Sequence, residues 1–237
     1  MTRSTITPPI RAINKSSRLS SGQWLLKGAA VGYSVVWIAG LLLASSSTDV
    51  TSSGGAIVRA DAPQAAALTF QFLLTEGVAA LALLVVVIGF WRATARGASR
   101  IVGLVAGVAA VAISLSQTVL GVCLIEIAVR HSDATLASSL TVSLNELDGV
   151  KMLLLAFMAL AFATARWRRR VRLPIWLLPT GIVTGVALVA SAIGYLTGSD
   201  AFAAAAWISL PLLLIFVTAV GLCLKPDSLA APIGVGR

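Results

Sequence analysis

Six long runs of apolar residues divide this chain, and they constrain its fold more than any other feature. Each run is long enough to cross a hydrocarbon core about 30 Å thick, which takes ~20 residues of helix. We therefore expect an all-α membrane protein with a six-helix transmembrane domain over residues 24–224. The predicted spans lie near residues 24–45, 66–91, 101–128, 148–165, 173–197 and 202–224.

The composition supports this class and leaves little material for catalysis. Of the 237 residues, 58% are hydrophobic and 11% are charged, whereas soluble domains carry roughly a quarter charged residues. One His and two Cys offer few ligands for a metal or haem, so no cofactor and no metal site is predicted. No hydrolase, metalloprotease or nucleotide-binding motif is present. The sequence therefore does not favour an enzyme.

Positive charge is strongly one-sided in this topology. Of the 18 Lys and Arg residues, all but Arg59, Arg130 and Lys151 lie on the side that holds both termini. The positive-inside rule then predicts that both termini are cytoplasmic and that the chain is a multi-pass protein of the cell membrane.

The densest basic cluster lies in the short loop between the fourth and fifth spans. A loop in that position is typical of a topology signal that meets anionic lipid headgroups, and not of nucleic-acid binding. The bilayer is therefore the expected partner, together with a second copy of the chain or another membrane protein. The lipid-facing cluster consists of Arg166, Arg168, Arg169, Arg170 and Arg172.

Both ends of the chain are expected to be cytoplasmic tails. Residues 1–23 form a basic, Ser-containing tail, predicted to be disordered, and residues 225–237 form the second tail. An alternative for the first span is a cleaved signal peptide, with a basic start, an apolar stretch over 28–43 and small residues after it. The outer loop over 45–63 is rich in Ser, Thr and Gly and is expected to be mobile.

Paired glycines recur near the start of the odd-numbered spans. Their GxxxG spacing allows close approach of helix backbones, and their similar intervals suggest three helical hairpins in series. The predicted packing positions are Gly28 and Gly32, Gly103 and Gly107, and Gly181 and Gly185.

Ionisable residues at bilayer depth are costly, so each is a candidate for function. Glu76 lies near the middle of the second span, with Thr69 on the same helical face and Gln71 on another. Glu126, four residues before Arg130, is best explained as one half of a surface ion pair.

Three further spans carry polar residues at comparable depth. Gln117 lies on a polar strip of the third span with Ser114 and Gly121, and Asp148 lies three residues before Lys151 at the start of the fourth span. In one interpretation, these side chains form an outward-facing pocket in which Glu76 binds a proton or cation. In the other, they form interhelical hydrogen bonds and Glu76 is protonated. The full candidate set is Glu76, Gln117, Asp148, Lys151, Ser191 and Tyr195.

Two local patterns concern the outer loop and the last span. Ser132-Asp133 resembles a helix N-cap, and the leucine stripe after it fits either a helix on the membrane surface or a continuation of the fourth span. Pro211 is expected to kink the sixth span.

The segment 144–152, with its Asp-Gly-x-Lys-Met element, resembles a group of uncharacterised six-span membrane proteins from high-GC bacteria. That resemblance implies Asp148 and Lys151 as site candidates, and it implies no activity. From the sequence we expect an interaction, regulatory or scaffold protein of the membrane. The alternative is a small secondary transporter or an ion or proton pathway that uses Glu76.

Overall fold

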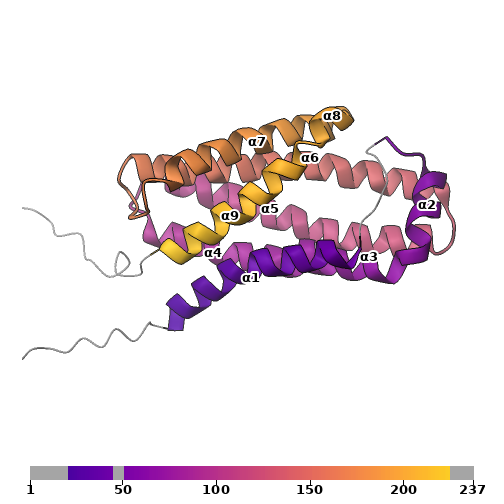
Figure 1. The fold of residues 1–237 in the computed structure, drawn as a ribbon, viewed down its shortest axis with the longest axis horizontal. Helices are drawn as coiled ribbons and strands as arrows, with labels where there is room; N and C mark the ends of the chain where they lie inside the picture. Colours follow the sequence, from indigo (N-terminus) through magenta and orange to yellow (C-terminus); the bar gives the residue numbers. More distant parts are fainter. Residues whose placement is uncertain (1–20, 45–50, 225–237) are drawn as a thin grey trace, which may run out of the picture.

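The structure is a computed structural model that describes residues 21–44 and 51–224, and every regular element within them is helical. Six helical stretches of these residues are long and apolar enough to cross a membrane, which confirms the predicted all-α, six-span architecture. They pack side by side as an elongated bundle, with the start of the first helix and the end of the last at the same end (Figure 1). The predictions for residues 1–20, 45–50 and 225–237 concern parts of the chain outside the described residues.

Five of the six observed spans begin earlier than the hydropathy bounds, and three of them also end later. Ser21 to Gln23, expected in the tail, already belong to the first helix. The elements in chain order are α1 (Ser21–Leu43), α2 (Gly54–Asp61), a 3-10 turn (Ala62–Gln64), α3 (Ala65–Phe72), a first π segment (Leu73–Val78), α4 (Ala79–Ala93), α5 (Ala98–Cys123), a second π segment (Leu124–Val129), α6 (Ala134–Trp167), α7 (Leu177–Thr197), α8 (Asp200–Ala203) and α9 (Ala206–Cys223).

Part of the loop that was expected to be mobile is helical. Within it, α2 buries Ile57 and Asp61 and packs against α6, whose first residue is Ala134. Gly54 makes this contact possible, because a Cβ atom there would lie 1.8 Å from the carbonyl oxygen of Ala134. Hydropathy predicted a loop here because the segment has few apolar residues, and it carries no information about this backbone contact.

The second and third spans each contain a π segment, in which backbone bonds run from residue i to i+5. Such a turn holds one residue more than an α turn, so it changes which side chains share a face. Gln71, just before the first π segment, and Glu76, within it, line the same cavity. The prediction that Gln71 points elsewhere assumed regular α-helix and is wrong.

The helix α6 is continuous from its cap to Trp167 and packs most extensively against α5 and α7. The carboxylate of Asp133 accepts a hydrogen bond of 2.9 Å from the backbone N–H of Leu136, which confirms the predicted N-cap. Of the two alternatives for the leucine stripe, continuation of the fourth span is therefore the observed one. Leu144 of this stripe is buried in an apolar cluster with Ile57 of α2 and Leu68 of α3.

At the end of the bundle where α1 begins and α9 ends, the core is closely packed. The rings of Phe90 and Phe162 are stacked with centroids 3.5 Å apart, and Phe216 of α9 lies 6.3 Å from Phe162. The glycines of α5 and α7 permit this packing, since a Cβ atom at Gly107 would lie 2.6 Å from Val87. Gly103, Gly181 and Gly185 likewise face neighbouring helices at 2.9–3.0 Å.

The first glycine pair behaves differently from the other two. A Cβ atom at Gly28 or Gly32 would meet nothing within 4 Å, so the expected helix contact is absent there. The reason is that α1 packs through the opposite face, which buries Ala30, Tyr33 and Gly40. The two spans of each predicted hairpin contact one another, but the threefold repeat itself stays a prediction.

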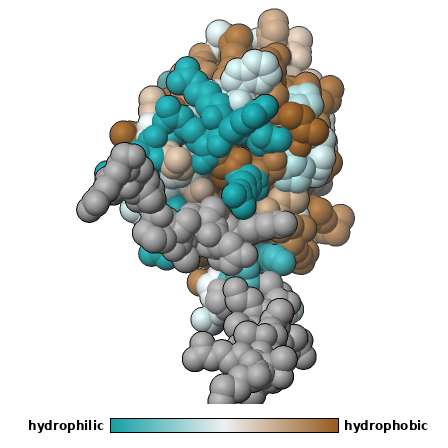
Figure 2. Space-filling model, turned by 90° about the vertical axis from the view of Figure 1, so that its left-hand side faces the viewer, coloured by the Kyte–Doolittle hydropathy of each residue, from teal (hydrophilic) through white to brown (hydrophobic). Residues whose placement is uncertain are grey.

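Hydrophilic side chains gather at the same end as the termini (Figure 2). There Arg170 links the two loops that follow α4 and α6: its guanidinium donates to the carbonyl of Arg96, and its own carbonyl accepts from the N–H of Ala95. Gly97 lies beside this contact with φ of 156°, and Arg170 occupies the space that a Cβ atom would need. We refer to this contact as the Arg170 clamp.

Candidate functional site

A cavity of about 370 Å³ lies in the half of the bundle away from the termini, with walls from all six spans. Sites for small molecules in proteins typically enclose ~300–1,000 Å³, so this cavity fits a small ligand. Lys151 in its wall is sixteen residues before Trp167, a distance of about 24 Å along α6 at the helical rise of about 1.5 Å per residue. The cavity therefore lies well away from the arginine-rich end.

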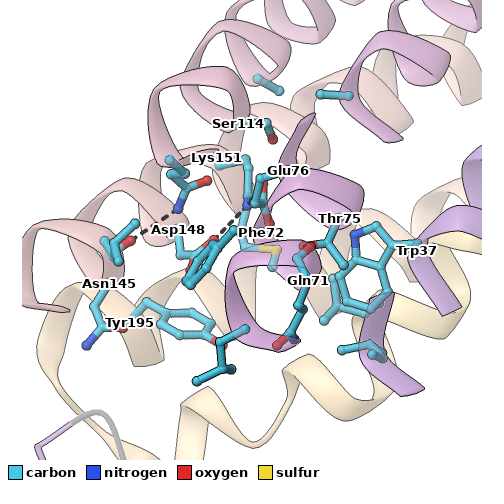
Figure 3. A pocket seen from close by; sticks show the side chains of 18 of the residues that line it. Trp37, Gln71, Phe72, Thr75, Glu76, Ser114, Asn145, Asp148, Lys151 and Tyr195 are labelled. Carbon is cyan, nitrogen blue, oxygen red and sulfur yellow. Dashed lines mark hydrogen bonds and ion pairs between the residues drawn. The ribbon is translucent and has the colours of Figure 1, made fainter. Parts of the chain in front are cut away.

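Three charged side chains meet in the cavity wall. The ammonium of Lys151 lies 2.8 Å from Oε2 of Glu76 and 2.7 Å from Oδ1 of Asp148. Figure 3 shows Lys151 reaching both carboxylates, one from the first π segment and one from its own helix. The Lys151 side chain is 8% exposed, Glu76 is 14% exposed and Asp148 is 28% exposed. We call these three residues the charged triad.

The charges of the cavity wall do not balance. Two carboxylates of the charged triad share one ammonium, and Asp61, which interacts with other groups of the chain, also lines the cavity. Among the described residues that line the cavity, Lys151 is the only cationic side chain. A buried charge is costly unless an opposite charge compensates it, so the wall favours a positively charged occupant.

Gln117 adds an unsatisfied acceptor to the same wall. Its amide nitrogen donates to the carbonyl oxygen of Leu144 at 3.2 Å. The amide oxygen, Oε1, therefore points away from Leu144. That oxygen is buried and has no hydrogen-bond partner, and the same holds for Oγ1 of Thr141. Leaving a buried acceptor unpaired costs about 1–3 kcal/mol.

Aromatic rings complete the lining. They are Tyr33 and Trp37 from α1, Phe72 from α3 and Tyr195 from α7. In Figure 3, Phe72 lies next to the charged triad, with Tyr195 and Trp37 on either side of it. The Phe72 ring packs directly against Gly121, where a Cβ atom would lie only 2.3 Å from the ring.

Five of the six predicted site residues line this cavity: Glu76, Gln117, Asp148, Lys151 and Tyr195. Ser191 does not line it. Its hydroxyl bonds that of Ser209 at 2.8 Å and the carbonyl of Ala187, one turn earlier. Although Ser191 and Tyr195 are one turn apart on α7, Ser191 is covered by α9.

The predicted pair of Glu126 and Arg130 is present, with 2.7 Å between Oε2 and Nε. The Thr69 hydroxyl donates a hydrogen bond of 2.9 Å to this carboxylate. Thr69 therefore bonds Glu126 and not Glu76, with which it was expected to share a helical face. This cluster lies outside the cavity lining.

Several lining residues were not predicted from the sequence. Asp61 was assigned to a loop, and Gln71 was placed on the wrong face. Asn145 carries a signal that could have been used, because it precedes Asp148 by three residues on the same helix. Nothing in the pattern of α1 distinguishes Tyr33 and Trp37 from lipid-facing aromatic residues.

Chemically, the site offers carboxylates, carbonyl-type acceptors and aromatic faces. No group of three or more His, Cys, Asp or Glu side chains suited to a metal ion occurs in residues 21–44 and 51–224. Comparisons with protein-family models, with curated proteins and with solved structures found no match for this chain. The function must therefore be argued from the site itself.

Proposed function

We propose that this polytopic membrane protein binds a small cation in the cavity and acts as a small secondary transporter or ion pathway. The observation that carries the proposal is the sharing of one ammonium, that of Lys151, between the carboxylates of Glu76 and Asp148. Ionisable residues inside a membrane domain mark ligand and ion pathways in many proteins.

In the charged triad, a cation can replace Lys151 at Glu76 while the charge of Lys151 stays compensated by Asp148. When a cation approaches Glu76, Lys151 keeps its contact with Asp148, three residues away on the same helix. When the cation leaves, Lys151 again neutralises Glu76. The lysine thus competes with the ligand, and this competition lets a bound cation leave again.

The orientation of the protein is part of the proposal. We propose that the arginine-rich end and both termini are cytoplasmic, by the positive-inside rule, and that the arginines there contact anionic lipid headgroups. The cavity then lies toward the outer face of the cell membrane. Reporter fusions at Met1 and in the loop around residue 48 test this orientation.

The test of the function is electrical measurement on proteoliposomes adsorbed to a solid-supported membrane. At constant ionic strength, Na⁺, K⁺, methylammonium or benzylammonium is introduced by rapid solution exchange. We expect wild type to give a charge-displacement current with at least one of these cations. Glu76→Gln and Asp148→Asn should abolish that current.

Glu126→Gln is the matched control, because it neutralises a carboxylate outside the cavity and should retain the current. Size-exclusion profiles establish that each variant is folded and monodisperse. The proposal fails if wild type responds to none of the four cations, or if Glu76→Gln responds as wild type does.

A second candidate function, as an interaction or scaffold protein, is favoured by one observation. The face of α1 that carries Gly28 and Gly32 is open, and Trp24 and Val35 beside it are exposed. Cross-linking of Gly28→Cys molecules in the bilayer tests whether a second copy covers this face. Efficient dimer formation, lost in Gly32→Ile, would support that role.

A further inference from the structure

The chemical class of the cation can be inferred from what the cavity wall offers. This step rests on the proposed function and specifies it. Three features are informative: the geometry of the carboxylates around nitrogen, the unpaired acceptors and the aromatic rings.

The charged triad already binds a primary ammonium group. Nζ of Lys151 bonds two carboxylate oxygens from two helices at 2.7 and 2.8 Å, lengths typical of N⁺–H···O⁻ hydrogen bonds. Glu76 and Asp148 are therefore spaced for a nitrogen that carries several N–H groups. Lys151 is an internal equivalent of such a ligand.

The unpaired acceptors favour a ligand with N–H groups over a quaternary ammonium, which has no hydrogen-bond donor on its nitrogen. Oε1 of Gln117 and Oγ1 of Thr141 lack donors although both are buried in residues that line the cavity. Both oxygens are closed off from solvent, so a ligand reaches them by moving the side chains that cover them. A donor supplied by the ligand would remove the cost of leaving them unpaired.

The aromatic residues indicate what the rest of the ligand is like. Cations are attracted to the faces of Trp, Tyr and Phe rings, and rings also stack on one another. Trp37, Phe72 and Tyr195 come from three different helices and line the same cavity as the triad (Figure 3). They provide an apolar and aromatic surface for the carbon skeleton beside the charged head.

We infer that the cavity binds a protonated organic amine with N–H groups on its nitrogen and an aromatic or apolar body. Its ammonium bonds Glu76 or Asp148 in place of Lys151 and donates to Gln117, while its body packs against Phe72 and Tyr195. A neutral isostere lacks the charge, and a quaternary ammonium lacks the donors.

The experiment is isothermal titration calorimetry with the full chain in lipid nanodiscs and three probes of similar shape. Benzylammonium has charge and donors, benzyltrimethylammonium has charge without donors, and benzyl alcohol has no charge. We expect benzylammonium to bind at least tenfold more tightly than either of the others. A site built to hydrogen-bond its ligand rejects analogues that cannot form those bonds.

Gln117→Leu separates the hydrogen bond from the charge, since it removes the acceptor and keeps the volume. It should weaken benzylammonium about tenfold and leave benzyltrimethylammonium within twofold. Glu126→Gln is again the control outside the cavity and should change neither affinity. Because both variants keep the charged triad, they remain informative if Glu76 variants fold poorly.

The possible results separate this inference from the proposed function. Equal affinities for the two cations, or an unchanged affinity for benzylammonium in Gln117→Leu, would overturn the amine assignment. Absence of binding by all three probes would overturn it as well, and so would tight binding of benzyl alcohol. In each of these cases, currents with Na⁺ or K⁺ that depend on Glu76 would still support the proposed function.

Discussion

The two halves of the bundle are built from the same helices but are held together differently. At the end where α1 begins and α9 ends, α4, α6 and α9 meet through stacked phenylalanines and small residues. In the other half, the first π segment and α6 both line the cavity, and they are joined by the charged triad. We call these halves the packed half and the cavity half.

This difference indicates a division of roles. Dense packing in the first half holds the helices in fixed positions, since protein interiors are packed as tightly as organic crystals. The second half can then hold charges that contribute little net stability, because desolvation of a buried ion pair offsets much of its attraction. We expect stability to depend on the packed half and ligand binding to depend on the cavity half.

The largest expected effect is on stability, from Phe162→Ala in the packed half. Loss of a buried phenylalanine costs about 3–5 kcal/mol of unfolding free energy, and Phe162 is 1% exposed between two other rings. Unfolding in mixed micelles with increasing SDS measures this loss. Binding per folded molecule should not change, and a selective loss of binding would contradict the division of roles.

Lys151→Met, in the cavity half, should cost about 3 kcal/mol, because removing one partner of a buried ion pair leaves the others uncompensated. The triple variant with Glu76→Gln and Asp148→Asn removes the whole triad and should recover most of that stability. The same SDS titration compares the two proteins. If the triple variant is the less stable one, the charged triad contributes to stability and the comparison between halves breaks down.

A smaller effect is expected from Ser209→Ala, which removes the hydroxyl pair between α7 and α9. Hydrogen bonds between membrane helices contribute about 0.6–2 kcal/mol, so the loss should be about 1 kcal/mol. Ser191→Ala should cost as much, and the double variant little more than either. Additive losses would show that the two hydroxyls act independently.

The smallest effect should come from Glu126→Gln at the outer surface. Its partner Arg130 has a side chain that is 49% exposed, and exposed pairs at this spacing contribute about 0.3–0.5 kcal/mol. The loss should shrink further in 1 M salt, which screens exposed charges. Thermal unfolding in detergent at two salt concentrations measures it, and a loss as large as that of Lys151→Met would refute this view of the pair.

The spans, the cap at Asp133 and most members of the site were predictable from the sequence. Apolar runs and charges at bilayer depth are strong signals, so Glu76, Asp148 and Lys151 could be identified before the structure. Ser191 was misplaced because helical periodicity gives a face but not the neighbour that covers it. Gln71 was missed as a cavity residue because hydropathy carries no sign of the π segment that follows it.

The same limit applies to glycine pairs and to the cavity itself. Gly28 and Gly103 both begin a GxxxG pair, yet one faces open space and the other Phe162. The carbonyl of Leu144, which orients Gln117, belongs to a residue with no polar side chain. Contacts of this kind depend on tertiary packing and leave no trace in a single sequence.

The Arg170 clamp has a mechanical consequence. It joins the loop after α4 to the loop after α6, so the two helix pairs on either side of it cannot separate at that end without breaking its hydrogen bonds. Any swing of one pair against the other therefore has its fulcrum at the arginine-rich end. The displacement grows with distance from that point and is larger in the half of the bundle that holds the cavity.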